Sequence, residues 1–385
     1  MLIPHAKSFL LAISVILTCP AVELAATREN VTRARLTAAA RSGGDYLVRV
    51  QRPDGSFHYY YYAAEDRFEQ RTYNIVRHAG TAISLFELYS QTRDIRYLDS
   101  AKRAVRFLET RFRSAPGRDA IYVLDFDGKA KLGANGLALV ALTKLLELDP
   151  KSSARAKAQR LANLILMLQR KDGSFHTRYR LRPNDPPGIA SLYYPGEAIL
   201  GLARLYYVTR DKRLLAAARR GADFLIASQR AMHTLPADAW LMQALEALYN
   251  IEHEKNYAEH TLALAAAMIA GQYTDEDTEG YAGGFGPGPP RVTPAASRAE
   301  GLVAAYRIAR STGDARASSI AAALKASARF QLTQQFTSEN NASARNPARA
   351  AGGFYEGSTE PWVRIDFVQH NISSLLGIAQ LIADF

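Results

Sequence analysis

The heptapeptide Gln-Arg-x-Asp-Gly-Ser-Phe occurs twice in this chain, as QRPDGSF at residues 51–57 and as QRKDGSF at residues 169–175. Gly-Gly-Phe recurs as a shorter echo at 283–285 and again at 352–354. Each copy follows a stretch with helical periodicity. The Asp-Gly pair favours a tight turn, and the phenylalanine is suited to anchor the loop. A motif repeated in this position indicates a fold built from repeated helical units, and we interpret it as structural rather than catalytic.

Two kinds of helical run alternate along the chain. Six runs are apolar on nearly all sides and rich in alanine and glycine, which is typical of helices buried on most sides. They span residues 78–89, 135–148, 197–207, 238–249, 300–309 and 371–382. Six other runs are amphipathic, with apolar residues at three- and four-residue steps and basic residues on the opposite face. These span residues 31–50, 97–112, 154–169, 213–229, 257–272 and 315–335.

The connections between the runs also alternate in length. Short turns lead from a buried to an amphipathic run at 92–98, 148–153, 209–215 and 311–317, whereas most connections in the other direction are long. Short turns at one end and long loops at the other describe a ring of helical hairpins. The sequence therefore predicts an all-α fold, an (α/α)6 toroid of six helical hairpins, with the buried runs inside and the amphipathic runs outside. We expect it to form one domain over residues 27–385.

The first 26 residues are typical of a secretory signal peptide. Lys7 precedes an apolar run over 9–17, and the segment ends in small residues at 25–26. The apolar run is too short to span a bilayer comfortably, and no later segment predicts a transmembrane span. We therefore expect a cleaved signal over 1–26 and a periplasmic or secreted protein. Cys19 is the only cysteine, so the mature chain would have no disulfide, no thiol nucleophile and no cysteine-bound metal.

The formal net charge of +11 favours anionic partners, such as acidic glycans or the cell envelope. A solvated surface with a basic bias is the competing explanation. The basic residues are spread along amphipathic helices and form no arm or binding motif, so we expect no nucleic-acid partner. An acidic run at 275–279 is better explained as a solvated loop than as a metal site. The chain has no zinc-protease, phosphate-loop, dinucleotide or serine-hydrolase motif, and we expect no metal and no cofactor.

The turn TRDIRYLDSAKRAVRFL at 92–108 resembles the Thr-Gly-Asp-x-x-Tyr-Leu-x-x-Ala turn of the six-hairpin glycosidase superfamily. That group includes glycoside hydrolases, polysaccharide lyases, sugar 2-epimerases and the helical domain of glucuronyl C5-epimerases. The resemblance covers the whole mature chain, implies the toroid fold, and transfers no catalytic residue. QRKDGSF is also similar to repeats of terpene cyclases and prenyltransferases. However, the acidic signature of the cyclases is absent, and the zinc site of the transferases needs a cysteine.

The first turns of the buried runs should surround the mouth of the ring, at the end with the long loops. Polar residues that converge over an apolar barrel form a plausible ligand site. The candidates at these positions are Arg77, His78, Asn135, Glu197, Asp238, Glu300, Asp366, His370 and Asn371. Aromatic side chains on the mouth loops and helix starts suit sugar rings, and the candidates are Tyr73, Tyr194, Trp240 and Trp362.

Most of these polar residues also have a structural explanation. Ser297 and Glu300 fit a capping box, and asparagine or aspartate is an ordinary helix N-cap. That explanation fails for Arg77, His78 and His370, because positive charge at a helix start opposes the helix dipole.

Three functions fit this pattern. The first is an exported hydrolase of an acidic oligo- or polysaccharide, with a carboxylate pair drawn from Glu197, Asp238, Glu300 and Asp366. The second is a polysaccharide lyase or uronyl C5-epimerase. There Arg77 would neutralise a uronate carboxylate, and Tyr73, Tyr194, His78 or His370 would move the proton. The third is a non-catalytic glycan-binding factor in envelope polysaccharide assembly.

Overall fold

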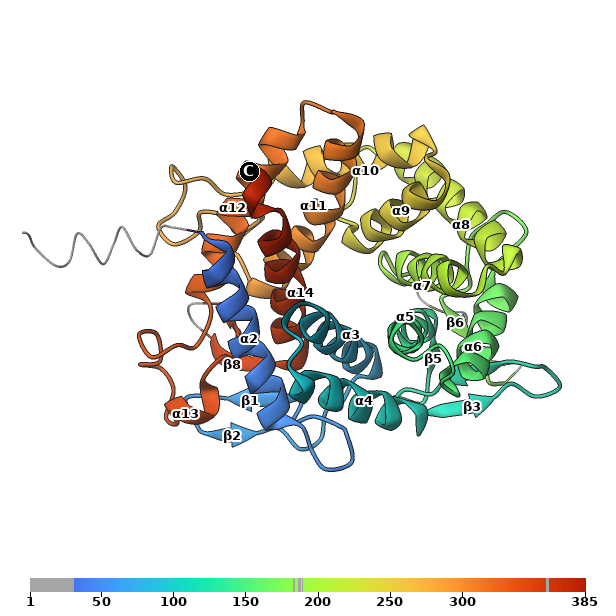
Figure 1. Cartoon of the computed structure of the whole chain (residues 1–385), viewed down its shortest axis with the longest axis horizontal. Helices are drawn as coiled ribbons and strands as arrows, with labels where there is room; N and C mark the ends of the chain where they lie inside the picture. Colours follow the sequence, from blue (N-terminus) through green and yellow to red (C-terminus); the bar gives the residue numbers. More distant parts are fainter. Residues whose placement is uncertain (1–30, 183, 186–187, 189, 358–359) are drawn as a thin grey trace, which may run out of the picture. The chain divides into compact units, whose positions relative to one another are not determined.

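The computed structural model describes residues 31–182, 184–185, 188, 190–357 and 360–385. Residues 32–385 form one compact unit, in which twelve long helices are arranged as two concentric rings (Figure 1). The inner ring consists of α3 (Ile75–Thr92), α5 (Leu132–Leu148), α7 (Tyr194–Thr209), α9 (Ala239–Glu252), α11 (Val292–Thr312) and α14 (Ile365–Leu381). The outer ring consists of α2 (Arg33–Val50), α4 (Ile95–Glu109), α6 (Ala154–Leu168), α8 (Lys212–Arg230), α10 (Lys255–Ala270) and α12 (Ala317–Thr333).

These twelve helices confirm the predicted (α/α)6 toroid. Each inner helix packs against its two inner neighbours and against at least one outer helix, and contacts between α14 and α3 close the inner ring. The first and last long helices, α2 and α14, lie side by side (Figure 1). The predicted signal peptide, residues 1–26, lies outside the described residues. Within the described part of the chain, no helix has the length and apolar character needed to cross a membrane.

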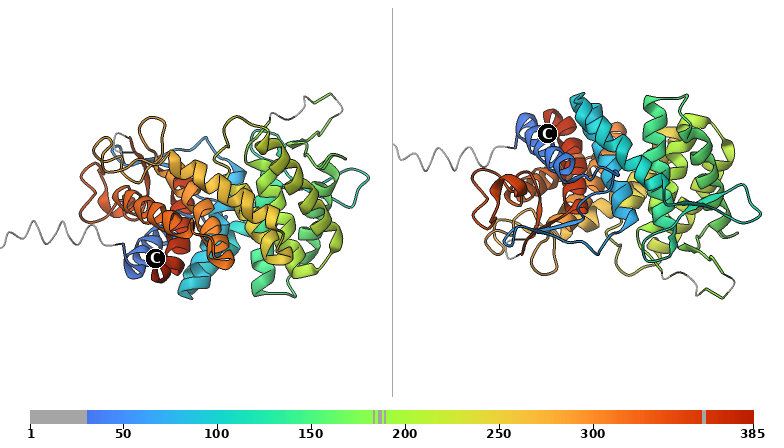
Figure 2. Two further views of the ribbon diagram at one scale, coloured as in Figure 1. Left: turned by 90° about the horizontal axis from the view of Figure 1, so that it is seen from above. Right: turned by 90° about the horizontal axis from the view of Figure 1, so that it is seen from below.

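Short strands lie in the long loops. They are β1 (Tyr60–Tyr62), β2 (Arg67–Phe68), β3 (Phe112–Ser114), β4 (Ile121–Val123), β5 (Ala130–Lys131), β6 (Arg178–Tyr179), β7 (Tyr355–Gly357) and β8 (Glu360–Arg364). The β3–β4 hairpin, drawn in teal, projects from the helices in both side views (Figure 2). Strand β1 of the first long loop pairs antiparallel with β8 of the last, with Tyr61 opposite Val363. The sheet order β2-β1-β8-β7 therefore ties the two ends of the ring together at the mouth. A short helix, α13 (Pro347–Ala350), and a 3-10 turn, Ile382–Asp384, complete the described elements.

The repeated motif links neighbouring outer helices. The Gln51 amide donates hydrogen bonds to the Gly55 carbonyl in its own loop (3.1 Å) and to the Ser100 carbonyl in α4 (3.0 Å). Gln169 and Gln272 repeat this arrangement onto α8 and α12. Gln335 bonds the carbonyl of Ala39 in α2, which joins the last outer helix to the first. Each glutamine also forms a β-bridge to the phenylalanine that ends the motif. This confirms the structural interpretation of the repeat.

The motif glycine adopts a backbone conformation that other residues rarely adopt. Gly173 has φ +93°, and a Cβ built on it would lie 2.3 Å from the Arg220 carbonyl oxygen in α8. The loop backbone can approach the next outer helix this closely only because no side chain intervenes.

We expect Gly173→Ala to destabilise the protein by more than about 3 kcal/mol, because both the backbone strain and the clash with α8 oppose folding. Gly128→Ala is the matched control. Gly128 also has a positive φ, +73°, but a Cβ there would meet nothing within 4 Å, so its cost should be about 1 kcal/mol. Thermal unfolding of both variants measures the difference. Equal losses of stability would show that the close approach to α8 contributes nothing.

Candidate active site

A cavity of about 550 Å³ opens at the long-loop end of the ring. The starts of α3, α7, α9 and α14 and the first part of α11 line it, as the sequence predicted for the mouth. Its polar and aromatic lining includes Arg77, Tyr194, Glu197, Trp240, Arg291, Arg298, Glu356, Arg364, Asp366, Gln369 and His370. Six of the thirteen predicted site residues are in this lining, namely Arg77, Tyr194, Glu197, Trp240, Asp366 and His370.

Asp366 is held between two arginines at the cavity wall. Its carboxylate accepts from Arg77 Nε at 3.0 Å and from Arg364 Nη2 at 2.8 Å, and Arg364 Nε makes a second close contact with it. The Asp366 side chain is only 5% exposed, so two guanidinium groups surround one buried carboxylate. The cluster has a net positive charge. An anionic group of a substrate can therefore bind beside it, whereas Asp366 itself has little freedom to act as a base.

Glu197 differs from the other carboxyl groups of the cavity because, among the described residues, it has no cationic partner. It lies in the first turn of α7, is buried, and its Oε2 has no hydrogen-bond partner among the described residues. Gly133 in α5 makes room for it, since a Cβ there would lie 2.1 Å from Glu197 Oε2. Burial, with a smaller effect from the charge of Asp238, raises the pKa of Glu197 to about 8. Glu197 is therefore protonated at neutral pH and can donate that proton.

Asp238 lies behind the cavity wall rather than in it. Its Oδ1 caps α9 by accepting from the Leu241 N–H (3.0 Å), and its Oδ2 accepts from Gln229 Nε2 (3.0 Å). Gln229 in turn hydrogen-bonds His260 at 2.9 Å. Burial raises the pKa of Asp238 to about 7, although both hydrogen bonds oppose the shift. The side chain is fully buried and does not line the cavity, so the geometry gives no support to the predicted catalytic role of Asp238.

His370 and Glu300 form a hydrogen-bonded pair below the mouth. His370 Nδ1 and Glu300 Oε1 are 2.8 Å apart, and Gln243 Nε2 donates to Glu300 Oε2 at 3.3 Å. Within the described residues, nothing bonds the other ring nitrogen, Nε2, and the His370 side chain lines the cavity. Burial alone would lower the pKa of His370, but the charge and hydrogen bond of Glu300 raise it overall. Burial raises the pKa of Glu300 despite His370.

The predicted position of Glu300 in the first turn of its helix is wrong. Helix α11 begins at Val292, so Glu300 lies more than two turns inside it and is no part of a capping box. The Pro-rich stretch before Ser297 suggested a loop, but Pro294 falls in the first helical turn, where a missing N–H is tolerated. Glu300 consequently lines the deeper cavities of the ring and reaches the mouth only through His370.

Five further candidates do not line the mouth cavity: His78, Tyr73, Asn135, Asn371 and Trp362. His78 is fully buried, bonds Tyr73 Oη (2.7 Å) and the Ala104 carbonyl (2.8 Å), and burial lowers its pKa to about 4. This side chain joins α3 to α4, and its position gives no support to the predicted catalytic role of His78.

The asparagines have similar structural roles. Asn135 accepts from the Val123 N–H and donates to the Lys131 carbonyl, and Asn371 is buried and donates to the Phe367 carbonyl. Trp362 lies in β8 and packs against Tyr60 and Phe367.

Three arginines of the cavity were not predicted: Arg291, Arg298 and Arg364. Arg291 pairs with Glu356 at 3.0 Å, and Arg298 lies over the Phe285 ring, where burial lowers its pKa. The Arg-x-Asp spacing of residues 364 and 366 was the only feature of the sequence that could have indicated an arginine at the cavity. Counting protonated Glu197 as neutral, the cavity carries four guanidinium groups against the carboxylates of Glu356 and Asp366.

No group of three or more His, Cys, Asp or Glu that would hold a metal ion occurs in the described ranges.

Comparison with known proteins places the fold. No protein-family model matches the chain, and no curated protein matches it. Among solved structures, the GH76A alpha-1,6-mannanase from Salegentibacter sp. HEL1_6 aligns over 90% of this chain and 99% of its own, with TM-score 0.65 and 13% identity. Cellobiose 2-epimerase from Bacillus thermoamylovorans B4167 aligns over 90% and 99%, with TM-score 0.66 and 14% identity. A D-mannose isomerase aligns over 90% and 97%, with TM-score 0.67 and 13% identity.

These proteins belong to the six-hairpin superfamily that the sequence resembles. At 13–14% identity the likeness establishes the toroid fold, and the chemistry has to be inferred from the cavity itself.

Proposed function

We propose that this protein is an exported glycan-active enzyme that transfers protons on an acidic oligo- or polysaccharide, as a lyase or uronyl epimerase. One observation carries the proposal: two proton-exchanging groups, Glu197 and the Glu300-held His370, line one arginine-rich cavity. Aromatic side chains of Tyr194 and Trp240 beside them suit the faces of sugar rings.

The first step uses the arginine cluster and the histidine. A uronate carboxylate binds beside Arg77 and Arg364, whose two positive charges exceed the single charge of Asp366. His370 Nε2 takes the proton from the carbon next to that carboxylate, and the electron pair of the C–H bond moves into the carboxylate. The guanidinium groups stabilise the growing negative charge. Glu300 fixes the imidazole ring and stabilises the imidazolium that forms.

The second step uses Glu197. In elimination, the electron pair delocalised into the carboxylate returns to form the new carbon–carbon double bond. The bond from the adjacent carbon to the glycosidic oxygen breaks, its electron pair leaves with that oxygen, and Glu197 protonates it. In epimerisation, Glu197 returns a proton to the same carbon from the opposite face. A carboxyl group with a pKa of about 8 is suited to donation at neutral pH.

Hydrolysis is the second candidate. Glu197 also suits the acid of a glycosidase, and an alpha-1,6-mannanase shares the fold. The partner carboxylate would be Asp366, which lines the same cavity. Because two arginines bind Asp366, and because Asp238 and Glu300 offer no free carboxylate to the mouth, the geometry favours proton transfer at carbon over hydrolysis. A non-catalytic glycan-binding role would use the same cavity without Glu197 chemistry.

Incubation with uronate-containing polysaccharides in D₂O separates these functions. We expect either ultraviolet absorbance from a 4,5-unsaturated uronate, which indicates a lyase, or deuterium at the uronate carbon next to the carboxylate, which indicates an epimerase. New reducing ends with neither signal would establish hydrolysis instead. Binding with no chemical change, unaltered in Glu197→Gln, would establish the glycan-binding role.

Export is part of the proposal, since residues 1–26 are typical of a cleaved signal. We expect the mature N-terminus within a few residues of Ala26. Full-length protein with Met1 attached in the cytoplasm would contradict export.

A further inference from the structure

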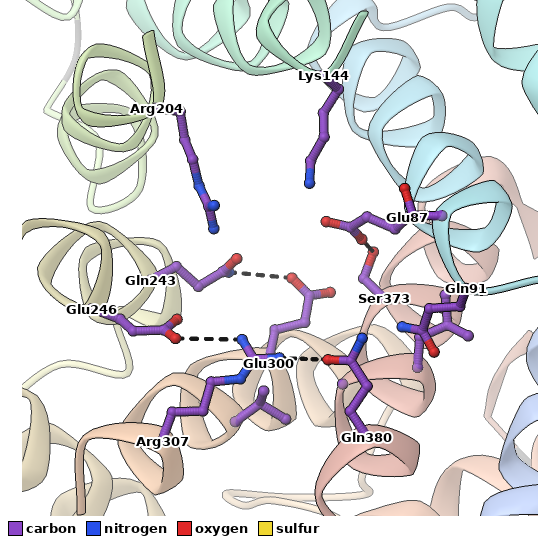
Figure 3. Close-up of a pocket in the computed structure, with 14 residues that line it drawn as sticks. Glu87, Gln91, Lys144, Arg204, Gln243, Glu246, Glu300, Arg307, Ser373 and Gln380 are labelled. Atoms are coloured by element: carbon purple, nitrogen blue, oxygen red, sulfur yellow. Dashed lines mark hydrogen bonds and ion pairs between the residues drawn. The ribbon is translucent and has the colours of Figure 1, made fainter. Parts of the chain in front are cut away.

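A second cavity lies inside the ring, below the His370–Glu300 pair. It has a volume of about 200 Å³, room for about six water molecules. Figure 3 shows its lining, to which all six inner helices contribute. A narrow space of about 40 Å³, bordered by Trp240 and Gln369 of the mouth, lies between this second cavity and the mouth cavity. We call the second cavity the axial cavity.

Two cations point into the axial cavity without a strong partner. Among the described residues, Arg204 of α7 has no hydrogen bond, ion pair or ring contact. Lys144 of α5 has a single ion pair within the described part of the chain, a distant one of 3.9 Å to Glu147, and its side chain is 20% exposed. Both side chains extend towards the centre of the cavity (Figure 3). Two converging cations without close partners, half-buried inside a ring, are costly unless an anion joins them.

The other charges of the axial cavity already have partners. Arg307 pairs with Glu246 at 3.4 Å and donates to Gln380 at 2.8 Å. Glu300 is bound to His370 and Gln243. Glu87 accepts from the Ser373 hydroxyl at 2.7 Å, which leaves its other oxygen as an acceptor. The lining thus holds three cations and three carboxylates, and among the described residues Lys144 and Arg204 are the two cations of this cavity without a close carboxylate partner.

We propose that the axial cavity binds a small anion whose other groups are hydroxyls. Its carboxylate or phosphate would lie between Lys144 Nζ and the Arg204 guanidinium, which offers paired N–H donors to such a group. Its hydroxyls would donate to Glu87 and hydrogen-bond the Gln91 amide at the rim. The volume limits the ligand to about the size of one sugar acid. This site is distinct from the mouth, and the proposal does not depend on the reaction there.

Calorimetric titration of the mature protein with D-glucuronate, inorganic phosphate and D-glucose tests the proposal. We expect saturable binding of glucuronate, weaker binding of phosphate, and none of glucose at the axial cavity. Arg204→Met and Lys144→Met should each weaken this binding at least tenfold, whereas Arg204→Lys should retain part of it. Arg77→Met, which removes one of the arginines proposed to hold a uronate at the mouth, is the matched control and should leave the axial site intact.

The variants also locate the site. If anion binding is weakened in Arg77→Met and unchanged in Arg204→Met, the anion binds at the mouth and the axial proposal fails. Absence of any saturable anion binding overturns it as well, as does glucose binding equal to glucuronate. Melting temperatures without ligand check that Arg204→Met and Lys144→Met are folded. Glucuronate-induced stabilisation that is present in wild type and Arg204→Lys but absent in Arg204→Met supports the site.

Discussion

Glu197→Gln is expected to abolish turnover and leave the fold intact. Glutamine preserves the shape of the buried side chain but has no proton to donate. General acid catalysis contributes on the order of 10²–10⁴ in rate, so turnover of the uronate-containing substrate should fall by at least about a hundredfold. In the wild-type enzyme, turnover should fall as the pH rises through about 8, because Glu197 then loses its proton. Initial rates of both proteins across the pH range measure this effect.

The same substitution has a second signature in stability. The pKa of Glu197 is raised from 4.5 when unfolded to about 8 when folded. The folded state therefore retains a proton that the unfolded chain releases, and stability falls as the pH rises from about 4.5 to about 8. At 1.36 kcal/mol per pKa unit, the loss is on the order of 5 kcal/mol. Glu197→Gln should remove this part of the loss, so the variant should melt at a higher temperature than wild type above pH 8.

Asp238→Asn tests whether a buried carboxyl with a raised pKa matters for turnover when its side chain does not line the cavity. Asp238 also has a raised pKa, about 7, so this variant should likewise reduce the loss of stability at alkaline pH. Because Asp238 does not line the cavity, and because asparagine also caps helices, turnover should survive. If Glu197→Gln retains near-normal turnover while its alkaline melting temperature rises, Glu197 is a buried carboxyl without a catalytic role.

The periodicity of the sequence was sufficient to predict the ring. An inner helix must be apolar on most sides and an outer helix on one, so the two patterns identify the two rings. The repeated Gln and Gly of the loops confirm the order of the hairpins, because Gln335 bonds back to Ala39 in the first outer helix.

The site was harder to predict because it depends on where helices begin. Helix α14 begins at Ile365, before the apolar run that predicted it, because charged residues occupy its first turn. Helix α11 begins at Val292, although Pro294 made this segment resemble a loop. In both cases the first helical turns precede the apolar run, so the apolar run alone predicted a helix start that is too late in the sequence. His78 and His370 are each near the start of an inner helix, yet only His370 lines the cavity. That difference depends on contacts with other helices. His78 bonds Ala104 in the outer helix α4, and His370 bonds Glu300 in the inner helix α11. Local sequence does not encode such contacts.

Glu300→Gln is expected to lower the pKa of His370 and to reduce turnover. The charge and hydrogen bond of Glu300 raise the pKa of His370, whereas burial lowers it. Without the carboxylate, burial should dominate and bring the pKa of His370 below its usual 6.5. In wild type, activity should rise as the pH passes through the raised pKa, because the base must be neutral. In the variant that limb should move to lower pH, and maximal turnover should fall at least about tenfold as the ring loses its orientation.

An NMR titration of the histidine ring protons, assigned with His370→Gln, measures the shift directly. Glu87→Gln is the matched control, because Glu87 lines the same axial cavity but bonds Ser373 rather than His370. Its effect on the pKa of His370 should be small. If Glu300→Gln leaves both the pKa of His370 and the acid limb of the activity profile unchanged, Glu300 does not tune the base. If instead the pKa falls and turnover stays normal, the pair is structural, and the proton must be taken by another group of the arginine-rich cavity.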